Sequence, residues 1–260
     1  MKKPLVLLVN DDGIGAPGLR HLWSSLKDFC DTLIVAPASD QSGVGLSVTL
    51  RKPLHIEEVE WEEKTPAWKI SGTPTDCIRM ALNVILKNPP DIIVSGINKG
   101  TNSGRNLLYS GTVGGVIEGA MRGIPGIAFS CESFTHPHYQ AFESQTFPLV
   151  EYLLSHPLPQ GSFLNVTFPS SHDFKHKGCR LARQGMSYYK EHPVKGVHPE
   201  GREYYWMGGI HEDHAEHEES DVQLLKAGYI TVVPVQVKEL TDLSSLEARK
   251  KLFDMRFQLK

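Results

Sequence analysis

The residues from Leu5 to Gly13 constrain the fold more than any other stretch of the chain. Leu5–Val9 is an uninterrupted apolar run of branched residues, which is typical of a strand buried on both faces of a parallel sheet. Asp11 and Asp12 follow it, and Pro17 suits the first turn of a helix. The two carboxylates therefore fall at the carboxyl end of a buried strand, where open α/β sheets bind their ligands. Adjacent acids at such a position repel each other and lose solvation, so a cation between them would compensate.

Strand and helix signals alternate over the first two thirds of the chain. Further buried strands are predicted at 32–36, 91–96, 126–130 and 162–168, and helices at 18–29, 74–86, 113–122 and 141–154. An extended stretch at 46–60, paired with 67–70, predicts an antiparallel excursion. This order predicts an α/β fold, Rossmann-like, with a doubly wound and mostly parallel sheet.

The alternation stops after Pro169. Residues 171–220 are rich in histidine and charge and have little periodicity, so we expect an extended, partly exposed β arm. A last core strand at 229–235 and a terminal helix at 244–257 close the chain. We therefore divide the protein into an α/β catalytic domain at 1–170 and a region at 171–260 that holds the arm, the last strand and the C-terminal helix, with an expected role in oligomerisation.

Composition excludes several classes of protein. A formal net charge of -3 gives no reason to expect nucleic acid as a partner. No segment approaches the ~18 consecutive apolar residues of a membrane span, so no membrane association is expected. The four cysteines are widely spaced without a Cys-x-x-Cys pair, which leaves zinc and redox motifs unsupported. We expect reduced thiols in a cytoplasmic protein.

Oxygen-bearing side chains follow three of the predicted strands. Asp11 and Asp12 follow the first, Ser42 lies in the loop after the second, and Asn98 stands just past the strand at 91–96. Carboxylate, amide and hydroxyl oxygens are the ligands that hard cations such as Mg²⁺ and Mn²⁺ prefer. The sequence predicts a divalent cation at this edge. The alternative is that the acids are solvated turn residues and that Ser42 and Asn98 are ordinary loop residues.

Residues 98–115 are dense in glycine, asparagine and hydroxyl side chains before a helix that begins near Val113. Free backbone N–H groups and a helix N-terminus together favour an anion. Lys99 and Arg105 in this stretch either pair with a phosphate or remain solvated surface charges.

Two further motifs have competing interpretations. Gly13, Gly15 and Gly18 match the dinucleotide fingerprint G-x-G-x-x-G of dehydrogenases, but the preceding acids would repel a pyrophosphate, which favours a tight turn and close helix packing. The run His211–His217 resembles a metal box. Acidic residues crowd it and no apolar run anchors it, so a solvated charged segment is favoured.

Five blocks in order closely resemble the SurE family of survival-protein nucleotidases. They are Val9–Gly13, Ala36–Gly43, Ser71–Asp76, Ser95–Gly100 and Tyr109–Val113. The likeness is strong over residues 5–130, and Tyr204–Gly209 and Ala227–Thr231 extend it more loosely. The resemblance implies a metal-dependent phosphatase that acts on nucleoside 5′- and 3′-monophosphates, and some members also cleave short polyphosphate.

The resemblance also implies roles for individual residues. One divalent ion per subunit, Mg²⁺ or Mn²⁺, would be held by Asp11, Asp12, Ser42 and Asn98, and phosphate would lie near Asn98 and near Ser110, Gly111 and Thr112. Asp11, Asp12 and Asn98 form the expected catalytic set, in which Asp12 also orients or deprotonates the attacking water. Homodimers or homotetramers would form through the C-terminal arm. The competing hypotheses are a non-catalytic nucleotide-binding protein, an NAD-type dehydrogenase that uses the three glycines, and an assembly module.

Overall fold

The computed structural model describes residues 2–170, 176–212 and 214–257, and its centre is a nine-stranded sheet in the order β3-β4-β2-β1-β5-β6-β7-β11-β8. The strands of the parallel core are β1 (Leu5–Val9), β2 (Asp31–Pro37), β4 (Ala67–Ile70), β5 (Ile92–Lys99), β6 (Gly126–Cys131) and β7 (Ser162–Phe168). β3 (Ile56–Glu58) and β11 (Ile230–Gln236) pair antiparallel with β4 and β7, and β8 (Cys179–Leu181) pairs parallel with β11. The predicted α/β fold with a mostly parallel sheet is confirmed.

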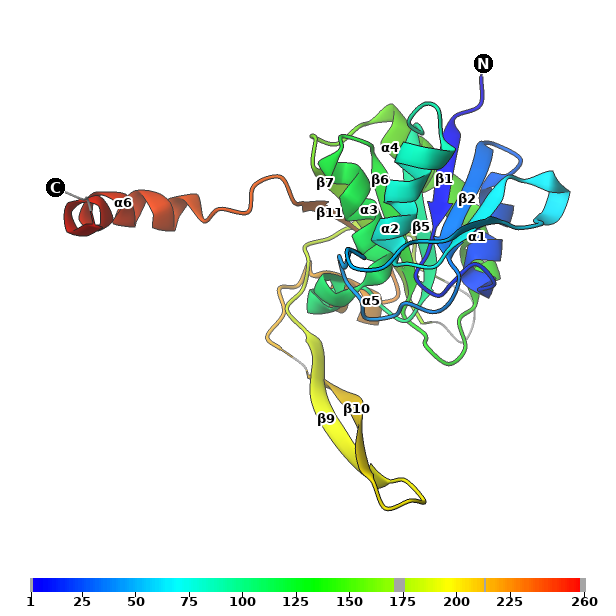
Figure 1. Ribbon diagram of the computed structural model, residues 1–260. Helices are drawn as coiled ribbons and strands as arrows, with labels where there is room; N and C mark the ends of the chain where they lie inside the picture. The colour runs from blue at the N-terminus through cyan, green and yellow to red at the C-terminus, as the bar shows by residue number, and fades with distance from the viewer. Residues whose placement is uncertain (1, 171–175, 213, 258–260) are drawn as a thin grey trace.

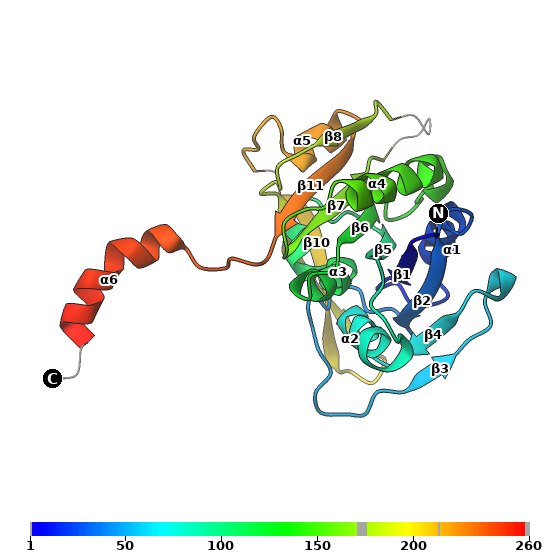
Figure 2. The ribbon, with the colours of Figure 1, turned by 90° about the horizontal axis from the view of Figure 1, so that it is seen from above.

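Helices cover both faces of this sheet (Figures 1 and 2). α1 (Pro17–Leu26) and α4 (Glu143–Ser155) lie on one face, and α2 (Pro74–Met80) and α3 (Gly111–Met121) lie on the other. The side chains of β1 alternate between the apolar cores on the two faces: Val6 and Leu8 enter one, and Leu7 and Val9 the other. Short 3-10 helices occupy Glu62–Lys64, Gly104–Tyr109 and Tyr139–Phe142, and a π-helical turn occupies Ala81–Ile85.

The antiparallel excursion is shorter than the sequence predicts. Only β3 forms within 46–60, and it pairs with β4 as expected. The reason lies in the helix cap that follows, because Thr73 and Asp76 form a capping box at the start of α2. The Thr73 hydroxyl also donates to the carbonyl of Ser47, and Asp76 accepts from the N–H of Thr49 at 3.1 Å. The side chains of Thr73 and Asp76 therefore hydrogen-bond to backbone groups that would otherwise be available for pairing with another strand.

The glycines after β1 have structural roles. Gly13 has a φ of 97°, which makes the tight turn possible. A Cβ on Gly18 would lie 2.0 Å from the carbonyl oxygen of Ile97, so a glycine is needed there for α1 to approach β5. Both features agree with the tight turn and close helix packing expected of these residues.

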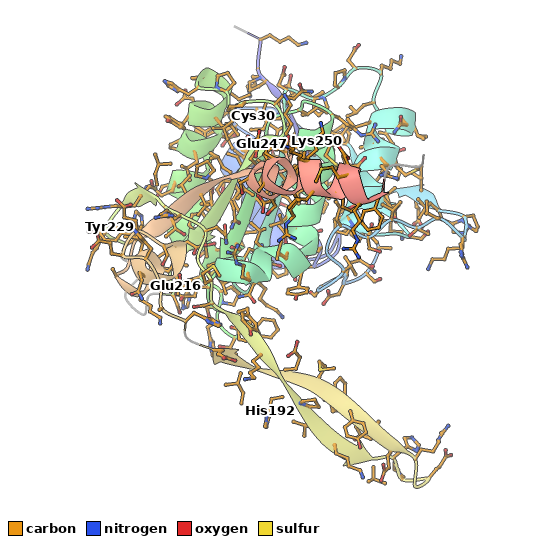
Figure 3. The ribbon with its side chains drawn as sticks, turned by 90° about the vertical axis from the view of Figure 1, so that its left-hand side faces the viewer. Cys30, His192, Glu216, Tyr229, Glu247 and Lys250 are labelled. Carbon is orange, nitrogen blue, oxygen red and sulfur yellow. The ribbon has the colours of Figure 1, made fainter. Side chains whose placement is uncertain are left out.

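The region after residue 176 sends two elements away from the sheet (Figure 1). β9 (Tyr188–Val197) and β10 (Glu203–Glu212) form an antiparallel hairpin, whose projecting part carries His192 in Figure 3. α5 (Asp221–Lys226), which the sequence did not predict, precedes β11. α6 (Leu243–Phe257) extends on its own at the end of a linker and buries no residue. The predicted β arm and terminal helix are thus confirmed.

Two histidines of the run His211–His217 make contacts with nearby residues. In the metal box, Asp213 and the side chain of His211 lie outside the described residues. His214 stacks on Tyr188 with ring centroids 5.1 Å apart, and His217 accepts a hydrogen bond from the N–H of Glu219. Among the helices that the structure describes, none has the length and apolar character that crossing a membrane would require.

Candidate active site

A pocket of about 770 Å³ opens where β1 and β5 end, and it brings together residues that the sequence placed on separate loops. Asp11, Ser42, Asn98 and Ser110 all line it. Three predicted oxygen ligands for a cation thus share one pocket with the first residue of the predicted phosphate loop.

Asp11 is the most buried of the candidate ligands, with 2% of its surface exposed. The Thr112 hydroxyl donates a hydrogen bond to Oδ1 of Asp11. Gly111 packs so closely that a Cβ there would lie 2.8 Å from the Asp11 Cβ. Burial raises the pKa of Asp11 from 3.8 to about 6, so the ionised carboxylate is poorly compensated by the protein alone.

The side chain of Asp12 does not enter the same pocket as that of Asp11. It lines an adjoining pocket of about 390 Å³ together with Gly13, Asp40, Lys99 and Tyr139. Its Oδ2 accepts a hydrogen bond from the backbone N–H of Lys99 at 3.3 Å, and burial raises its pKa as well. The backbone bends at Asp11 and Asp12 after β1 ends, and the two neighbouring acids border different pockets. Lys99 borders both pockets.

Ser42 and Asn98 have their donor protons engaged elsewhere. The Ser42 hydroxyl and N–H both donate to Oδ1 of Asp40, at 2.6 and 2.7 Å. Asn98 donates through Nδ2 to the carbonyl of Gly100 at 2.8 Å. The lone pairs of the Ser42 hydroxyl and the Oδ1 atom of Asn98 therefore remain available as acceptors in the pocket.

The phosphate-loop residues form the N-terminus of α3. The helix begins at Gly111, two residues before the predicted start, because Ser110 is its N-cap and accepts a hydrogen bond from the N–H of Val113 at 3.2 Å. The N–H groups of the first turn have no partner within the helix and carry the positive end of its dipole. Ser110, Gly111 and Thr112 thus place the N-terminus of α3, a position that favours anions in proteins generally, beside Asp11.

Comparison with known proteins places the chain in a family. The family model described as "Survival protein SurE" matches residues 6–191. The chain belongs to the SurE family. It is 48% identical over 254 residues to the protein named 5′-nucleotidase SurE from Protochlamydia amoebophila (strain UWE25), with 97% of each chain covered.

Two further relatives agree with this assignment. The 5′-nucleotidase SurE of Caldanaerobacter subterraneus subsp. tengcongensis is 40% identical over 255 residues, with 97% of each chain covered. The crystal structure of SurE protein from Aquifex aeolicus superposes with a TM-score of 0.81 at 35% identity, and covers 96% of this chain and 100% of that one. The family that the five sequence blocks suggested is therefore confirmed over nearly the whole chain.

The pocket also contains Asn102, which the sequence did not single out as a functional residue. Asn102 lines the pocket with 3% of its surface exposed, and within the described ranges its Nδ2 atom has no hydrogen-bond partner. Its backbone is fixed, because its carbonyl accepts from Asn165 Nδ2 at 3.0 Å and its N–H donates to the Ser130 hydroxyl. A rigidly held, unpaired donor in a pocket is a ready contact for an anionic ligand. The spacing Asn98-x-x-x-Asn102 in the glycine-rich stretch was the available signal.

The two basic residues of the stretch 98–115, Lys99 and Arg105, have different surroundings. Lys99 lines the pocket, and its Nζ lies 4.5 Å from the centroid of the Phe134 ring. Arg105 does not line the pocket, and its guanidinium lies against the Met186 sulfur instead. Lys99 is therefore the better placed of the two for a phosphate.

The β9–β10 hairpin also contributes to this pocket. The hairpin residues that line it are Tyr189, Glu191, Met207, Gly208 and Gly209. The arm region of this SurE-family chain therefore belongs to the site as well as to the periphery of the molecule.

Proposed function

We propose that this chain is a divalent-metal-dependent nucleotidase, a hydrolase that converts nucleoside 5′- and 3′-monophosphates to nucleoside and phosphate and also cleaves short polyphosphate. The SurE relatives carry the name 5′-nucleotidase. The observation that carries the proposal is the pocket in which the oxygen acceptors of Asp11, Ser42 and Asn98 adjoin the helix terminus at Ser110. A cation and a phosphate both find their preferred partners there.

The donor set fits one Mg²⁺ or Mn²⁺ ion per subunit. In the part of the chain that the structure describes, no three His, Cys, Asp or Glu side chains gather as a metal cluster, so the ion would depend on amide and hydroxyl oxygens beside the carboxylates. Hard cations accept such a mixed oxygen set. Asp11, Asp12, Ser42 and Asn98 would hold the ion. When bound, it supplies charge neutralisation and polarises a phosphoryl oxygen.

The chain's own groups account for the remaining steps. The N–H group of Gly111 and the Nδ2 of Asn102 would donate to the phosphoryl oxygens as negative charge develops on them, while the Thr112 N–H donates to the Asp11 carboxylate. Asp12 would orient the attacking water and accept its proton. Water oxygen bonds to phosphorus, the ester bond breaks, and the leaving oxygen takes up a proton, so no covalent enzyme intermediate is needed.

The dehydrogenase alternative finds less support. The pocket beside Gly13 and Gly15 is bordered by the carboxylates of Asp12 and Asp40, which would repel a pyrophosphate. Gly13 and Gly18 are also accounted for by the turn and by helix packing.

A phosphate-release assay tests the proposal. Nucleoside monophosphates are incubated with Mg²⁺ or Mn²⁺, and with a chelator. We expect metal-dependent release, and loss of activity on the order of 1000-fold or more in Asp11→Asn. Asp28→Asn, which changes an exposed carboxyl away from the pocket, serves as the control. An Asp11→Asn enzyme that is active in chelator would refute the metal site, and inactivity on every nucleotide with either metal would favour a non-catalytic binding protein.

We also propose a homodimer or homotetramer built from the region at 171–260, with the catalytic domain at 1–170. α6 exposes Leu252, Phe253 and Met255 and buries none of its residues, and β10 exposes Trp206. Apolar surface of this kind marks a protein–protein interface.

A cytoplasmic location is proposed from the four cysteines, which are all free thiols.

A further inference from the structure

One face of the β9–β10 hairpin is turned toward the pocket. Side chains alternate along a strand, so Tyr189 and Glu191 share a face of β9. The register pairs Glu191 with Gly209 and Pro193 with Met207, which places Met207 and Gly209 on that same face. Tyr189, Glu191, Met207 and Gly209 all line the pocket, so the alternation and the pocket agree on which face is presented.

This face combines an aromatic ring with a carboxylate that no cross-strand side chain opposes. Glu191 pairs with Gly209, which has no side chain. The Tyr189 ring lies next to the same glycine, with its Cδ1 3.6 Å from the position that a Cβ of Gly209 would take. Tyr189 is 52% exposed, and Met207 is 75% exposed. Exposed aromatic and thioether surface within a polar pocket suits a planar ring that stacks.

Glu191 differs from other acids of the hairpin. Glu203 and Glu212 pair across the strands with Lys195 and Lys190. Glu191 faces a glycine instead, and its carboxylate borders the pocket. An ionised carboxylate only accepts hydrogen bonds, so its ligand must present donors.

We propose that this hairpin face is the nucleobase subsite of the pocket and that Glu191 selects guanine. The inference rests on the proposed nucleotidase function and specifies its substrate. Guanine presents two adjacent donors, N1–H and the exocyclic amino group, which match the two oxygens of one carboxylate. Adenine presents an amino group beside an acceptor nitrogen, which a carboxylate disfavours. The base stacks on Tyr189 while the phosphate lies at Ser110 and Asn98, at the other part of the same pocket.

Steady-state kinetics of the full-length protein on GMP, AMP and the base-free ribose 5-phosphate test this subsite. Wild type should prefer GMP, and Glu191→Gln should lower the ratio of kcat/KM for GMP over AMP by between about 5- and 100-fold. Ribose 5-phosphate should be hydrolysed equally by both, which also shows that the variant is folded. The matched control is Glu203→Gln on the same hairpin, which should keep the wild-type ratio.

The stacking role has its own variants. Tyr189→Ala should raise KM for GMP and AMP by about 10-fold with little change in ribose 5-phosphate hydrolysis, and Tyr189→Phe should restore both values. A GMP to AMP ratio in Glu191→Gln within twofold of wild type would overturn the subsite while leaving the nucleotidase function intact. Wild type inactive on all three substrates would overturn the proposed function and the subsite with it.

Discussion

The carboxylate of Asp221 accepts a hydrogen bond from the backbone N–H of Gly104 at 3.1 Å, across 117 residues of sequence. The same buried side chain accepts from the N–H of Gly185 at 2.8 Å and from Nε2 of Gln184 at 2.9 Å. Gln184 in turn donates to the carbonyl of Gly104 at 2.6 Å. One side chain thus ties the loop that carries Asn102 to the segment that leads into the hairpin.

The stability of the protein should depend on pH through Asp221. Burial raises the pKa of Asp221 from 3.8 to about 6, although backbone N–H groups oppose that shift. The folded state then binds the proton more tightly than the unfolded state, so this carboxyl's contribution to the free energy of unfolding falls as pH rises between about 4 and 6 and is level above. The expected change is on the order of 3 kcal/mol.

Urea unfolding at several pH values from 4.5 to 7 measures this contribution. Asp221→Asn should lose the Asp221 part of the pH dependence, whereas Asp28→Asn, at an exposed position, should keep it. Identical pH profiles for wild type and Asp221→Asn would contradict the prediction.

The elements of the sheet could be predicted from the sequence because buried parallel strands read as continuous apolar runs. Leu5–Val9 is the clearest case, and its burial on both faces also placed Asp11 at the end of the sheet that holds the pocket. The capping box of Thr73 and Asp76 was equally readable, since a cap involves only residues close in sequence.

Other features depend on contacts between distant residues. Asn102 is fixed by Asn165, 63 residues away, so the local spacing Asn98-x-x-x-Asn102 could draw attention to the residue but could not show that it is held in place. The hairpin enters the pocket through a register between β9 and β10 that alternation alone does not specify. That Asp12 borders the adjoining pocket likewise depends on its contact with the Lys99 N–H.

Thr112 should set the metal affinity of Asp11. Its hydroxyl donates to Oδ1 of Asp11, which orients the carboxylate and lowers the cost of its charge. Thr112→Val removes this donor with little change in shape, and the metal concentration for half-maximal activity should rise about 10- to 100-fold. Titrations of activity and of thermal stability with Mn²⁺ would measure the change.

Thr75→Val is the matched control for that substitution. The Thr75 hydroxyl is buried, and the described part of the chain offers it no hydrogen-bond partner, so its loss should be neutral or stabilising. The metal dependence of Thr75→Val should match wild type. An unchanged metal dependence in Thr112→Val would refute the proposed role.

Asn102 should contribute to phosphate binding with little effect on stability. Its Nδ2 atom is buried in the pocket without a partner in the described structure, so Asn102→Ala breaks no protein hydrogen bond made by that atom. We expect kcat/KM to fall about 10- to 100-fold, and further in Asn102→Asp, where a negative charge would face the phosphate. Asn83→Ala, at an exposed position of the π-helical turn Ala81–Ile85, should retain wild-type kinetics, and wild-type kcat/KM in Asn102→Ala would contradict the role.

α6 should control assembly without controlling chemistry. Figure 3 shows the helix in front of the sheet, with Glu247 and Lys250 labelled. The exposed apolar side chains of a helix that buries none of its residues gain free energy by packing against another subunit, so Leu252→Glu with Phe253→Glu should lower the solution mass measured by light scattering.

Lys251→Glu changes the charge of α6 but removes no apolar surface, so it should keep the wild-type mass. Phosphate release by the double variant distinguishes an enzyme that assembles through α6 from a pure assembly module. If the pocket of one chain suffices, the smaller species remains active, because α6 contributes no residue to the pocket lining. A pure assembly module would release no phosphate in either form. A monomeric wild type, or a double variant of unchanged mass, would show that α6 is not the interface.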